Sequence, residues 1–335
     1  MADVAVPVPL AIPNLPTPAG AKAEVGAAPA TPSSASSSST PDVAFLDTPL
    51  RAPFDAIGQL FDHLRANPAA AEALNATYPT RGVFKAAAVR NGTSDQKLTV
   101  DLSPNRLSGV PDALRATLAP HGFDRVLEFF GALMTQHLDP VMGALGASAA
   151  GEGSNSGIDF APLHRARNVN FRLCDYTPDT AAPQSENGCG AHRDYGTFSI
   201  IFQDGTAGLE VESPARPGVW LPVPADRVVV LCGWSAFVLS GGELRAVRHR
   251  VRRQPGVRRL SAVLFVAPDL DVVLRPLPTA KQTTRFSNAV TSGEISVSWF
   301  KEFMGKRWRY REGNAQLEDG ERITQDVDIE RLLLA

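Results

Sequence analysis

Short runs of β-forming residues, separated by turn residues, fill the stretch from Asn168 to Leu274. Runs of this length, rich in Val, Ile, Phe and Thr and bounded by Gly, Pro, Asp or Ser, are typical of strands. Many short strands in close succession favour a β-sandwich or jelly roll. The predicted strands are residues 168–174, 197–203, 209–212, 219–223, 227–232, 236–239, 243–251, 258–266 and 270–274.

Helical periodicity flanks this β-rich stretch on both sides. Upstream, apolar residues recur at helical spacing in 53–66, 111–118 and 123–138, and Pro140 should end or kink the last of these helices. Gly146 to Gly157 is expected to be a break. Downstream, a helix is expected around Ile295 to Arg307, in a segment that packs outside the barrel. The fold class is therefore mainly β with flanking helices (α+β).

One motif brings together the residue types of a metal site. His192 and Asp194 occur in GAHRDYG, and His249 is the only histidine of the later run RAVRHRV. Side chains two residues apart on a strand point to the same face, so His192 and Asp194 can bind one metal ion, which His249 completes from a distant strand. Two histidines and one carboxylate are the ligand set of the non-haem Fe(II) oxygenases. We call these three residues the triad.

A second pair of residues is suited to bind a carboxylate. Arg259 and Ser261 are two residues apart in RRLSAVLFV, so both point to one face of the predicted strand. The planar guanidinium can bond both carboxylate oxygens, and the hydroxyl adds a donor. We call this pair the carboxylate clamp. Phe265 shares its face, either as core or as the wall of a substrate pocket. A metal site together with such a clamp is what a 2-oxo acid cosubstrate requires.

These motifs, taken in order from Phe171 to Pro268, resemble the Fe(II)- and 2-oxoglutarate-dependent dioxygenases, in the branch that includes isopenicillin N synthase and the plant flavonoid and hormone oxygenases. The order is RLCDYTP, GAHRDYG, TFSIIFQD, GLEV, VWLPVP, RVVVLCGW, RAVRHRV and RRLSAVLFVAP. Upstream, Asp95 and Lys97 match the family's DxKE region. The resemblance implies a double-stranded β-helix (jelly roll) that carries the metal at its open end.

The resemblance also implies an activity. Its cofactors would be Fe(II), 2-oxoglutarate and O2, with ascorbate as a candidate reductant. The triad would hold the iron and form the catalytic centre, and the carboxylate clamp would hold 2-oxoglutarate. Tyr176 resembles the family's tyrosine that bonds the same carboxylate, although Thr177 stands before Pro178 here. The expected reaction hydroxylates, desaturates or cyclises a small organic substrate and releases succinate and CO2.

The resemblance and the composition together predict the organisation of the chain. Residues 1–42 are rich in Pro, Ala and Ser, with Lys22 as the one basic residue, so we expect a disordered tail that is dispensable for chemistry and is neither a signal nor a transit peptide. The other parts are a helical N-terminal region (43–165), the jelly-roll core (166–275) and a C-terminal helical extension (276–335).

Charge and cysteine content help to predict the cellular compartment and the kinds of binding partner. The net charge of −2 gives no global attraction to nucleic acid or to an anionic membrane. The three cysteines (Cys174, Cys189 and Cys232) are an odd and sparse set, which suits a reducing compartment. No stretch is long and apolar enough to span a bilayer. We therefore expect a cytoplasmic monomer that binds a small molecule and no nucleic acid.

Two alternatives to this function stay open. The arginines from Arg245 to Arg259, and the mixture of basic and aromatic residues from Lys306 to Arg311, could bind a phosphate backbone, as in a nucleic-acid-binding β-barrel. An iron oxygenase of this fold that does not use 2-oxoglutarate would also keep the triad. Iron binding and the salt dependence of nucleic-acid affinity separate these possibilities.

Overall fold

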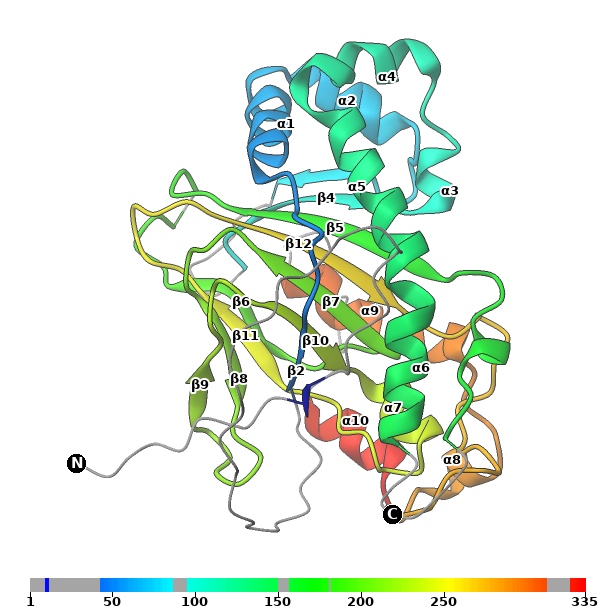
Figure 1. The fold of residues 1–335 in the computed structure, drawn as a ribbon. Coiled ribbons are helices and arrows are strands. Elements are labelled where there is room, and N and C mark those ends of the chain that lie inside the picture. The colour runs from blue at the N-terminus through cyan, green and yellow to red at the C-terminus, as the bar shows by residue number, and fades with distance from the viewer. Residues whose placement is uncertain (1–9, 12–42, 87–94, 150–156, 181, 312–325) are drawn as a thin grey trace, which may run out of the picture.

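Two antiparallel sheets lie face to face at the centre of the molecule (Figure 1). The computed structural model describes residues 10–11, 43–86, 95–149, 157–180, 182–311 and 326–335. The larger sheet consists, in order, of β1 (Leu10–Ala11), β2 (Val43–Leu46), β10 (Val228–Cys232), β7 (Phe198–Gln203), β12 (Arg259–Val266), β5 (Val169–Tyr176), β4 (Leu98–Leu102) and β3 (Phe84–Ala86). The smaller sheet consists of β6 (Asn187–His192), β11 (His249–Arg252), β8 (Leu209–Glu212) and β9 (Trp220–Pro222).

The chain passes back and forth between the two sheets from β5 to β12. Strands β5, β7, β10 and β12 belong to the larger sheet, while β6, β8, β9 and β11 belong to the smaller one. This alternation is the path of a double-stranded β-helix, so the predicted jelly roll is confirmed. All of these pairings are antiparallel; the one parallel pairing among the described strands joins β1 to β2.

Side chains of the larger sheet alternate between a core and a cavity. On β5 and β12, Phe171, Leu173, Ala262 and Leu264 point away from the smaller sheet into the main apolar core. Their neighbours in the sequence line a cavity between the sheets: Asn170, Arg172, Cys174 and Tyr176 on β5, and Arg259, Ser261, Val263 and Phe265 on β12. The period of two along a strand therefore separates residues that stabilise the fold from residues that face the cavity.

Helices of the N-terminal region pack on the outer face of the larger sheet (Figure 1). They are α1 (Phe54–Ala66), α2 (Pro68–Ala76), α3 (Pro104–Leu107), α4 (Asp112–Leu118), α5 (Phe123–Gln136) and α6 (Leu138–Ser148), with 3₁₀ turns at Ala119–His121 and Ala161–Leu163. Aromatic rings join helix to sheet, since Phe130 stacks on Phe171 with ring centroids 5.0 Å apart and Phe129 meets Phe202 edge-on at 5.1 Å. Strands β2, β3 and β4 also come from this region, so it is not helical alone.

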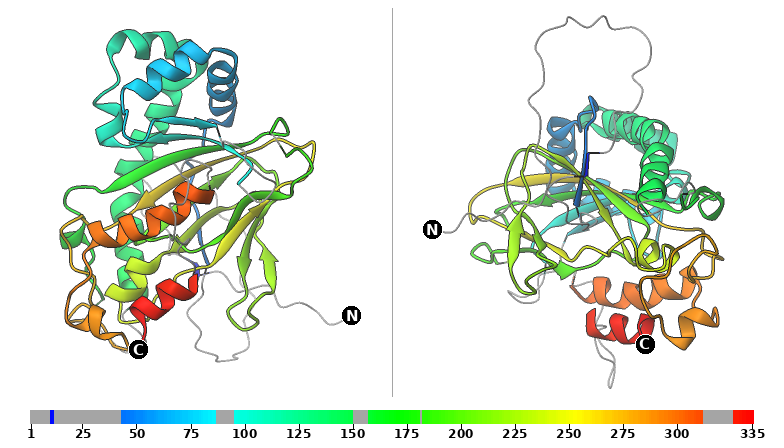
Figure 2. Two further views of the ribbon diagram at one scale, coloured as in Figure 1. Left: turned by 180° about the vertical axis from the view of Figure 1, so that it is seen from behind. Right: turned by 60° about the horizontal axis from the view of Figure 1, so that its bottom comes forward.

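The C-terminal helices lie on the other side of the sheets. They are α8 (Asn288–Thr291), α9 (Val297–Arg311) and α10 (Asp326–Leu333). Helix α9 lies behind the sheets in Figure 1 and in front of them after a half turn (Figure 2, left), opposite to α5 and α6. The helix predicted near 295–307 is thus present. Among the described residues, no helix has the length and apolar content that crossing a membrane requires.

Several predicted elements are wrong or shifted. Residues 236–239 belong to a helix, α7 (Trp234–Leu239), and 270–274 form only an isolated bridge between Val273 and Ser296. Both are short apolar runs, for which periodicity does not distinguish a strand from a buried turn or helix. Gly146 lies within α6 rather than in a break. The predicted tail (1–42) lies outside the described residues, except for the two residues of β1.

Candidate active site

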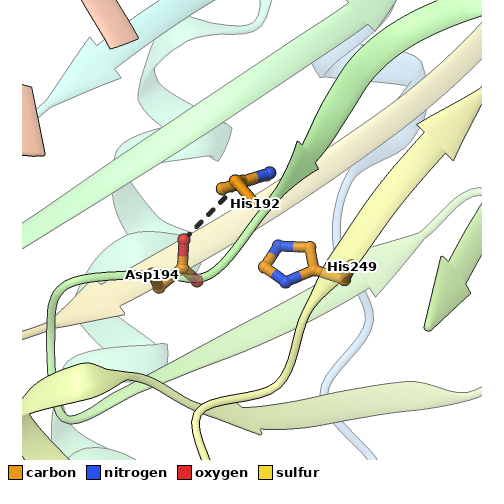
Figure 3. Close-up of side chains that lie close together, drawn as sticks. All are labelled: His192, Asp194 and His249. Atoms are coloured by element: carbon orange, nitrogen blue, oxygen red, sulfur yellow. Dashed lines mark ion pairs between the residues drawn. The ribbon is translucent and has the colours of Figure 1, made fainter. Parts of the chain in front are cut away.

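The three triad side chains lie close together (Figure 3), and all three line the cavity between the sheets. His192 and His249 are paired across β6 and β11, and their ring centroids are 4.3 Å apart. Nε2 of His192 lies 3.6 Å from Oδ1 of Asp194, and one ligand atom from each residue lies within 4.8 Å of the other two. All three residues are buried. The structure therefore brings together the residues that the sequence predicted.

Asp194 reaches this position in a different way from the prediction. We expected it on one strand with His192, but β6 ends at His192 and Asp194 lies in the turn that follows. Close backbone contacts fix this turn: the amide of Trp234 donates to the carbonyl of Asp194 at 2.9 Å, and Gly233 lies against it. A Cβ at Gly233 would lie 2.4 Å from the carbonyl oxygen of Gly196, so only glycine fits there.

Hydrogen bonds orient each triad side chain. Nδ1 of His192 lies 2.9 Å from the carbonyl oxygen of Gly190, and Nδ1 of His249 lies 3.1 Å from that of Val247. Because a carbonyl can only accept, Nδ1 is the donor in both rings, and in the neutral imidazole this leaves the lone pair of Nε2 for a metal. Such second hydrogen bonds are typical of metal-binding histidines. Ser199 donates to Oδ2 of Asp194 at 2.5 Å, which leaves Oδ1 for the metal.

This donor set fits Fe(II). Ligand atoms at adjacent corners of an octahedron with bonds of about 2.1 Å lie about 3 Å apart, so the observed 3.6 Å separation of Nε2 and Oδ1 needs only a small inward rotation. Two imidazoles and one carboxylate occupy one face of the octahedron and leave three positions for other ligands. The site thus has the donor types, the orientation and the spacing that a non-haem iron centre needs.

Arg259 has the features of an anion-binding residue. It is buried, with Nε donating to the carbonyl of Thr206 and Nη2 to Oε1 of Gln203, both at 3.1 Å. Its Nη1 is buried and has no hydrogen-bond partner among the described residues, and no described carboxylate lies within ion-pair distance of the side chain. A buried unpaired charge costs several kcal/mol. The Nη1 group is therefore suited to a carboxylate ligand.

The other two residues predicted to bind the cosubstrate lie near Arg259. Its guanidinium lies 5.2 Å from the ring centroid of Tyr176, the residue paired with it on β5. Ser261 is buried on the same face of β12, and both it and Tyr176 line the cavity. Burial raises the pKa of the Tyr176 hydroxyl, which therefore stays protonated and available as a donor. The structure places all three predicted cosubstrate residues around one part of the cavity.

One cavity of about 870 Å³ connects the triad with the carboxylate clamp. This volume is in the range of sites that bind a cosubstrate together with a small organic molecule. Phe265 lies in the wall of the cavity, which favours the second of the two roles considered for it. Helix α9 closes another side with Lys301, Gly305 and Trp308, which share one helical face. The C-terminal extension, which was predicted to pack outside the barrel, thus also forms one wall of the cavity.

The DxKE region has a structural role beside the site. Lys97 and Asp95 form a buried ion pair of 3.0 Å, and the other carboxylate oxygen of Asp95 accepts from the backbone N–H of Gly190 at 2.8 Å. Since Gly190 also orients His192, this pair fixes the strand that carries the first triad residue.

Sequence reasoning missed several residues of the site, namely Ser199, the pair Asp101 and Arg172, and the cavity face of α9. The alternation of TFSIIFQ could have indicated that Ser199 faces the cavity. The pairing of Asp101 with Arg172, with N–O distances of 2.7 and 3.1 Å, joins strands far apart in the chain and leaves no local signal.

The arginine-rich runs are largely paired within the molecule. Arg248 contacts Glu212 and Asp326 at 2.9 and 2.8 Å, and Arg250 contacts Glu210 at 2.6 Å. Arg307 of α9 bonds Asp326 and the carbonyl of Ala191. These guanidinium groups stabilise the contacts of β11 and α9 with their neighbours.

The fold and the site together define a jelly-roll protein with a two-histidine, one-carboxylate centre. Residues 156–268 match the family model of the 2OG-Fe(II) oxygenase superfamily. The chain is similar to proline hydroxylase buaE of Petromyces alliaceus (30% identity over 193 residues; 53% of this chain and 59% of the relative). It is also similar to 2-oxoglutarate-dependent dioxygenase tropC of Talaromyces stipitatus (37% over 112 residues; 32% and 34%). The match therefore spans less than two thirds of the length of these relatives.

A solved structure supports the same fold. The crystal structure of the dioxygenase for auxin oxidation in rice superposes with a TM-score of 0.53 at 20% identity, covering 87% of this chain and 90% of that one. The family match, the fold and the triad agree. Residues 156–268 therefore resemble the 2OG-Fe(II) oxygenase superfamily, and the fold around them is that of the rice enzyme.

Proposed function

We propose that this protein is an Fe(II)- and 2-oxoglutarate-dependent oxygenase that oxidises a small organic molecule. The observation that carries the proposal is the single cavity that is lined both by the oriented triad and by a buried Arg259 nitrogen without a partner among the described residues. The triad alone would fit any iron oxygenase of this fold. Because the Nη1 group of Arg259 is buried without a partner among the described residues, it favours an iron oxygenase that uses a 2-oxo dicarboxylate.

Charge balance supports this assignment. Fe(II), the Asp194 carboxylate and a dianionic 2-oxo acid carry a net charge of −1, which Arg259 neutralises inside the cavity. Neutrality matters there, because an unbalanced charge in a buried site costs several kcal/mol. Arg259 would bond the distal carboxylate with its Nη1 group, and the hydroxyls of Ser261 and Tyr176 would add neutral donors.

When bound, the iron and 2-oxoglutarate supply dioxygen activation coupled to oxidative decarboxylation: substrate C–H, O2 and 2-oxoglutarate give the hydroxylated product, succinate and CO2. The residues of this chain orient the reactants and exclude water. His192, Asp194 and His249 fix the metal position, the carboxylate clamp fixes the orientation of the cosubstrate, and Phe265 and Trp308 cover the reaction space with apolar surface. Desaturation or ring closure would use the same centre with a different substrate position.

We further propose that the protein acts as a cytoplasmic monomer on a small molecule rather than on nucleic acid. Pairing of the arginines of β11 and α9 with internal carboxylates supports this choice, because paired cations gain less from a phosphate backbone. Salt-independent or undetectable binding to DNA and RNA is expected. Affinity that falls steeply with salt would instead favour the nucleic-acid-binding alternative.

The experiment that tests the function combines metal analysis with turnover. Protein purified anaerobically is expected to bind one Fe(II) per chain and, in a metabolite screen, to couple O2 uptake to succinate release. His249→Ala should lose iron and turnover with little loss of folded structure, while Arg250→Ala, its outward-facing neighbour, should keep both. A wild-type protein without iron, or His249→Ala with normal iron affinity, would disprove the assignment.

A further inference from the structure

Besides Arg259, the cavity wall holds two partly buried cations that form no ion pair with a carboxylate of the described residues. Arg106 and Lys301 both line the cavity, one from α3 and the other from α9. No carboxylate in the part of the chain that the structure describes lies within ion-pair distance of either side chain. A partly buried cation normally has a counter-charge, so these two groups indicate where an anion can bind.

Neutral groups hold the Arg106 side chain in place. Its Nη1 donates to Oδ1 of Asn170 at 2.9 Å, its Nε donates to the carbonyl of Gly82 at 3.3 Å, and the guanidinium lies 4.8 Å from the ring centroid of Tyr78. These contacts fix its position, and the charge of the buried Asp101 also acts on it, although Asp101 is itself paired with Arg172 and Lys85.

Lys301 is in a similar environment. Its Nζ lies 3.4 Å from Oδ1 of Asn168 and 5.9 Å from the ring centroid of Tyr195, the residue that follows Asp194. Burial lowers the pKa of Lys301, and the nearby charges of Arg81 and Arg106 lower it further. Glu302 is the one acidic side chain that acts against this effect, and it pairs with Arg81 at 2.8 Å.

Strand geometry places the two cations next to each other. Asn168 and Asn170 accept from Lys301 and Arg106 respectively, and they are two residues apart where the chain enters β5. Residues two apart on a strand lie about 7 Å from each other on one face. The two cationic groups can therefore contact one carboxylate between them.

The acidic residues of this wall are fewer than its cations. Asp101 is paired with Arg172 and Lys85, and both oxygens of Asp269 accept from the backbone N–H of Ala166. Asp271 is exposed. The outer part of the cavity thus keeps an excess of positive charge, separate from Arg259.

We propose that the primary substrate is a small organic acid whose carboxylate lies between Arg106 and Lys301. This inference rests on the proposed function, because it assigns the acid to the same cavity as the triad. Lys301 contacts the ring of Tyr195, the residue that follows Asp194, so an acid held between the two cations lies in the same cavity as the triad and near the turn that carries Asp194.

The test compares acids with their neutral amides. The probes are 3-phenylpropanoate, 4-phenylbutanoate and decanoate, each with its primary amide, titrated by calorimetry into the anaerobic Fe(II)–2-oxoglutarate protein. At least one acid should bind about tenfold more tightly than its amide, the scale of one charge-assisted hydrogen bond. Lys301→Met and Arg106→Gln should each remove most of this preference and leave amide affinity unchanged.

Controls separate the site from general charge effects. Lys281→Met and Arg115→Gln remove exposed cations outside the cavity and should keep the preference. The wild-type comparison of acid with amide stands even if a variant folds poorly. Equal binding in all three pairs, or a preference that survives both cavity substitutions, would overturn the proposal.

The metal-to-ligand charge-transfer band of the Fe(II)–2-oxoglutarate complex shows whether the anion site alone is wrong or the proposed function as well. If the band forms and no acid is preferred, only the anion site is wrong. If no band forms, the proposed function fails, and the assignment of an acid as substrate fails with it.

Discussion

Asp101 shows how a single buried charge organises one wall of the cavity. Its side chain is 1% exposed and accepts from Arg172, Lys85 and Asn170. Although burial by itself raises the pKa of Asp101, the charges of Arg172 and Lys85 outweigh it and hold this pKa well below its usual range. The carboxylate therefore stays ionised and stabilises the fold at neutral pH.

Asp101→Asn should lower the free energy of unfolding by about 3 kcal/mol at neutral pH, because it removes the buried carboxylate charge that both Arg172 and Lys85 contact. The folded-state pKa is depressed, so the stabilisation is present above the ordinary carboxyl value and is lost as pH falls below about 3.9. Urea unfolding of both proteins measures the difference. Asp124→Asn, which removes a half-exposed ion pair with Arg115, is the matched control and should change little. Equal effects of the two substitutions would contradict this reading.

His164 is a buried neutral histidine with both ring nitrogens bonded. Nδ1 lies 2.7 Å from the carbonyl of Phe160, and Nε2 lies 2.7 Å from the hydroxyl of Thr197. Burial lowers its pKa, and Arg167 adds to this effect, while the Phe160 carbonyl and Asp269 oppose it. The unfolded chain therefore takes up a proton near pH 6.5 before the folded one does.

The stability gained from His164 should fall as pH drops below about 6.5, by at most about 1.4 kcal/mol per pH unit. Above that pH it should be constant, because the residue is neutral in both states. His164→Gln has no titrating group at this position. The stability difference between wild type and this variant, measured by denaturant unfolding, should shrink from pH 7.5 to 5.5. A difference that does not change with pH would contradict the account.

At the scale of elements, helix α9 is part of the site rather than a scaffold. Trp308 lines the cavity and packs on Tyr195 with ring centroids 5.4 Å apart. Trp299, two turns earlier, is 48% exposed and stacks on Phe303 of the same helix. The two tryptophans differ in what they contact, and this makes them a matched pair.

Trp308→Ala should destabilise the protein by about 2 kcal/mol, less than the loss for a fully buried aromatic ring because Trp308 is partly exposed. Trp299→Ala should lower the free energy of unfolding by well under half of the loss expected for Trp308→Ala. Chemical unfolding of both variants gives the comparison. If both variants lose the same free energy of unfolding, then the contact of Trp308 with Tyr195 does not stabilise the fold.

The elements also show what the sequence can and cannot predict. Strand alternation correctly places Arg259, Ser261 and Phe265 on the cavity face of β12. Local patterns fail to predict the secondary structure where tertiary contacts determine it. The short apolar run of α7 is an example, since it is buried beside the turn of Asp194. Local patterns also fail for Lys301, because nothing within α9 indicates which of its faces meets the cavity.

At the scale of the whole molecule, the triad and the carboxylate clamp both lie outside the first forty-two residues. Of that segment the structure describes only β1, whose backbone pairs with β2. Its role as a dispensable tail stays a prediction from composition.

A chain that begins at Asp42 should keep its iron content and its 2-oxoglutarate affinity, and its thermal midpoint should shift by no more than about 2 °C. Thermal unfolding and metal analysis of the shortened chain check this. Loss of iron or of cosubstrate binding would make the segment part of the active site.

The central claim, that one cavity binds iron and 2-oxoglutarate through the triad and Arg259, is tested most directly by an anaerobic titration. Adding 2-oxoglutarate to the Fe(II) protein should produce the metal-to-ligand charge-transfer absorbance. Arg259→Lys keeps the charge but loses the hydrogen bonds to Thr206 and Gln203 that orient the charged group, so the apparent affinity should fall by about tenfold to a hundredfold, and Ser261→Ala should cost less. Arg258→Lys alters the adjacent arginine, which pairs with Asp62 and Asp175 away from the cavity, and should titrate like wild type. An unchanged titration in Arg259→Lys would contradict the account.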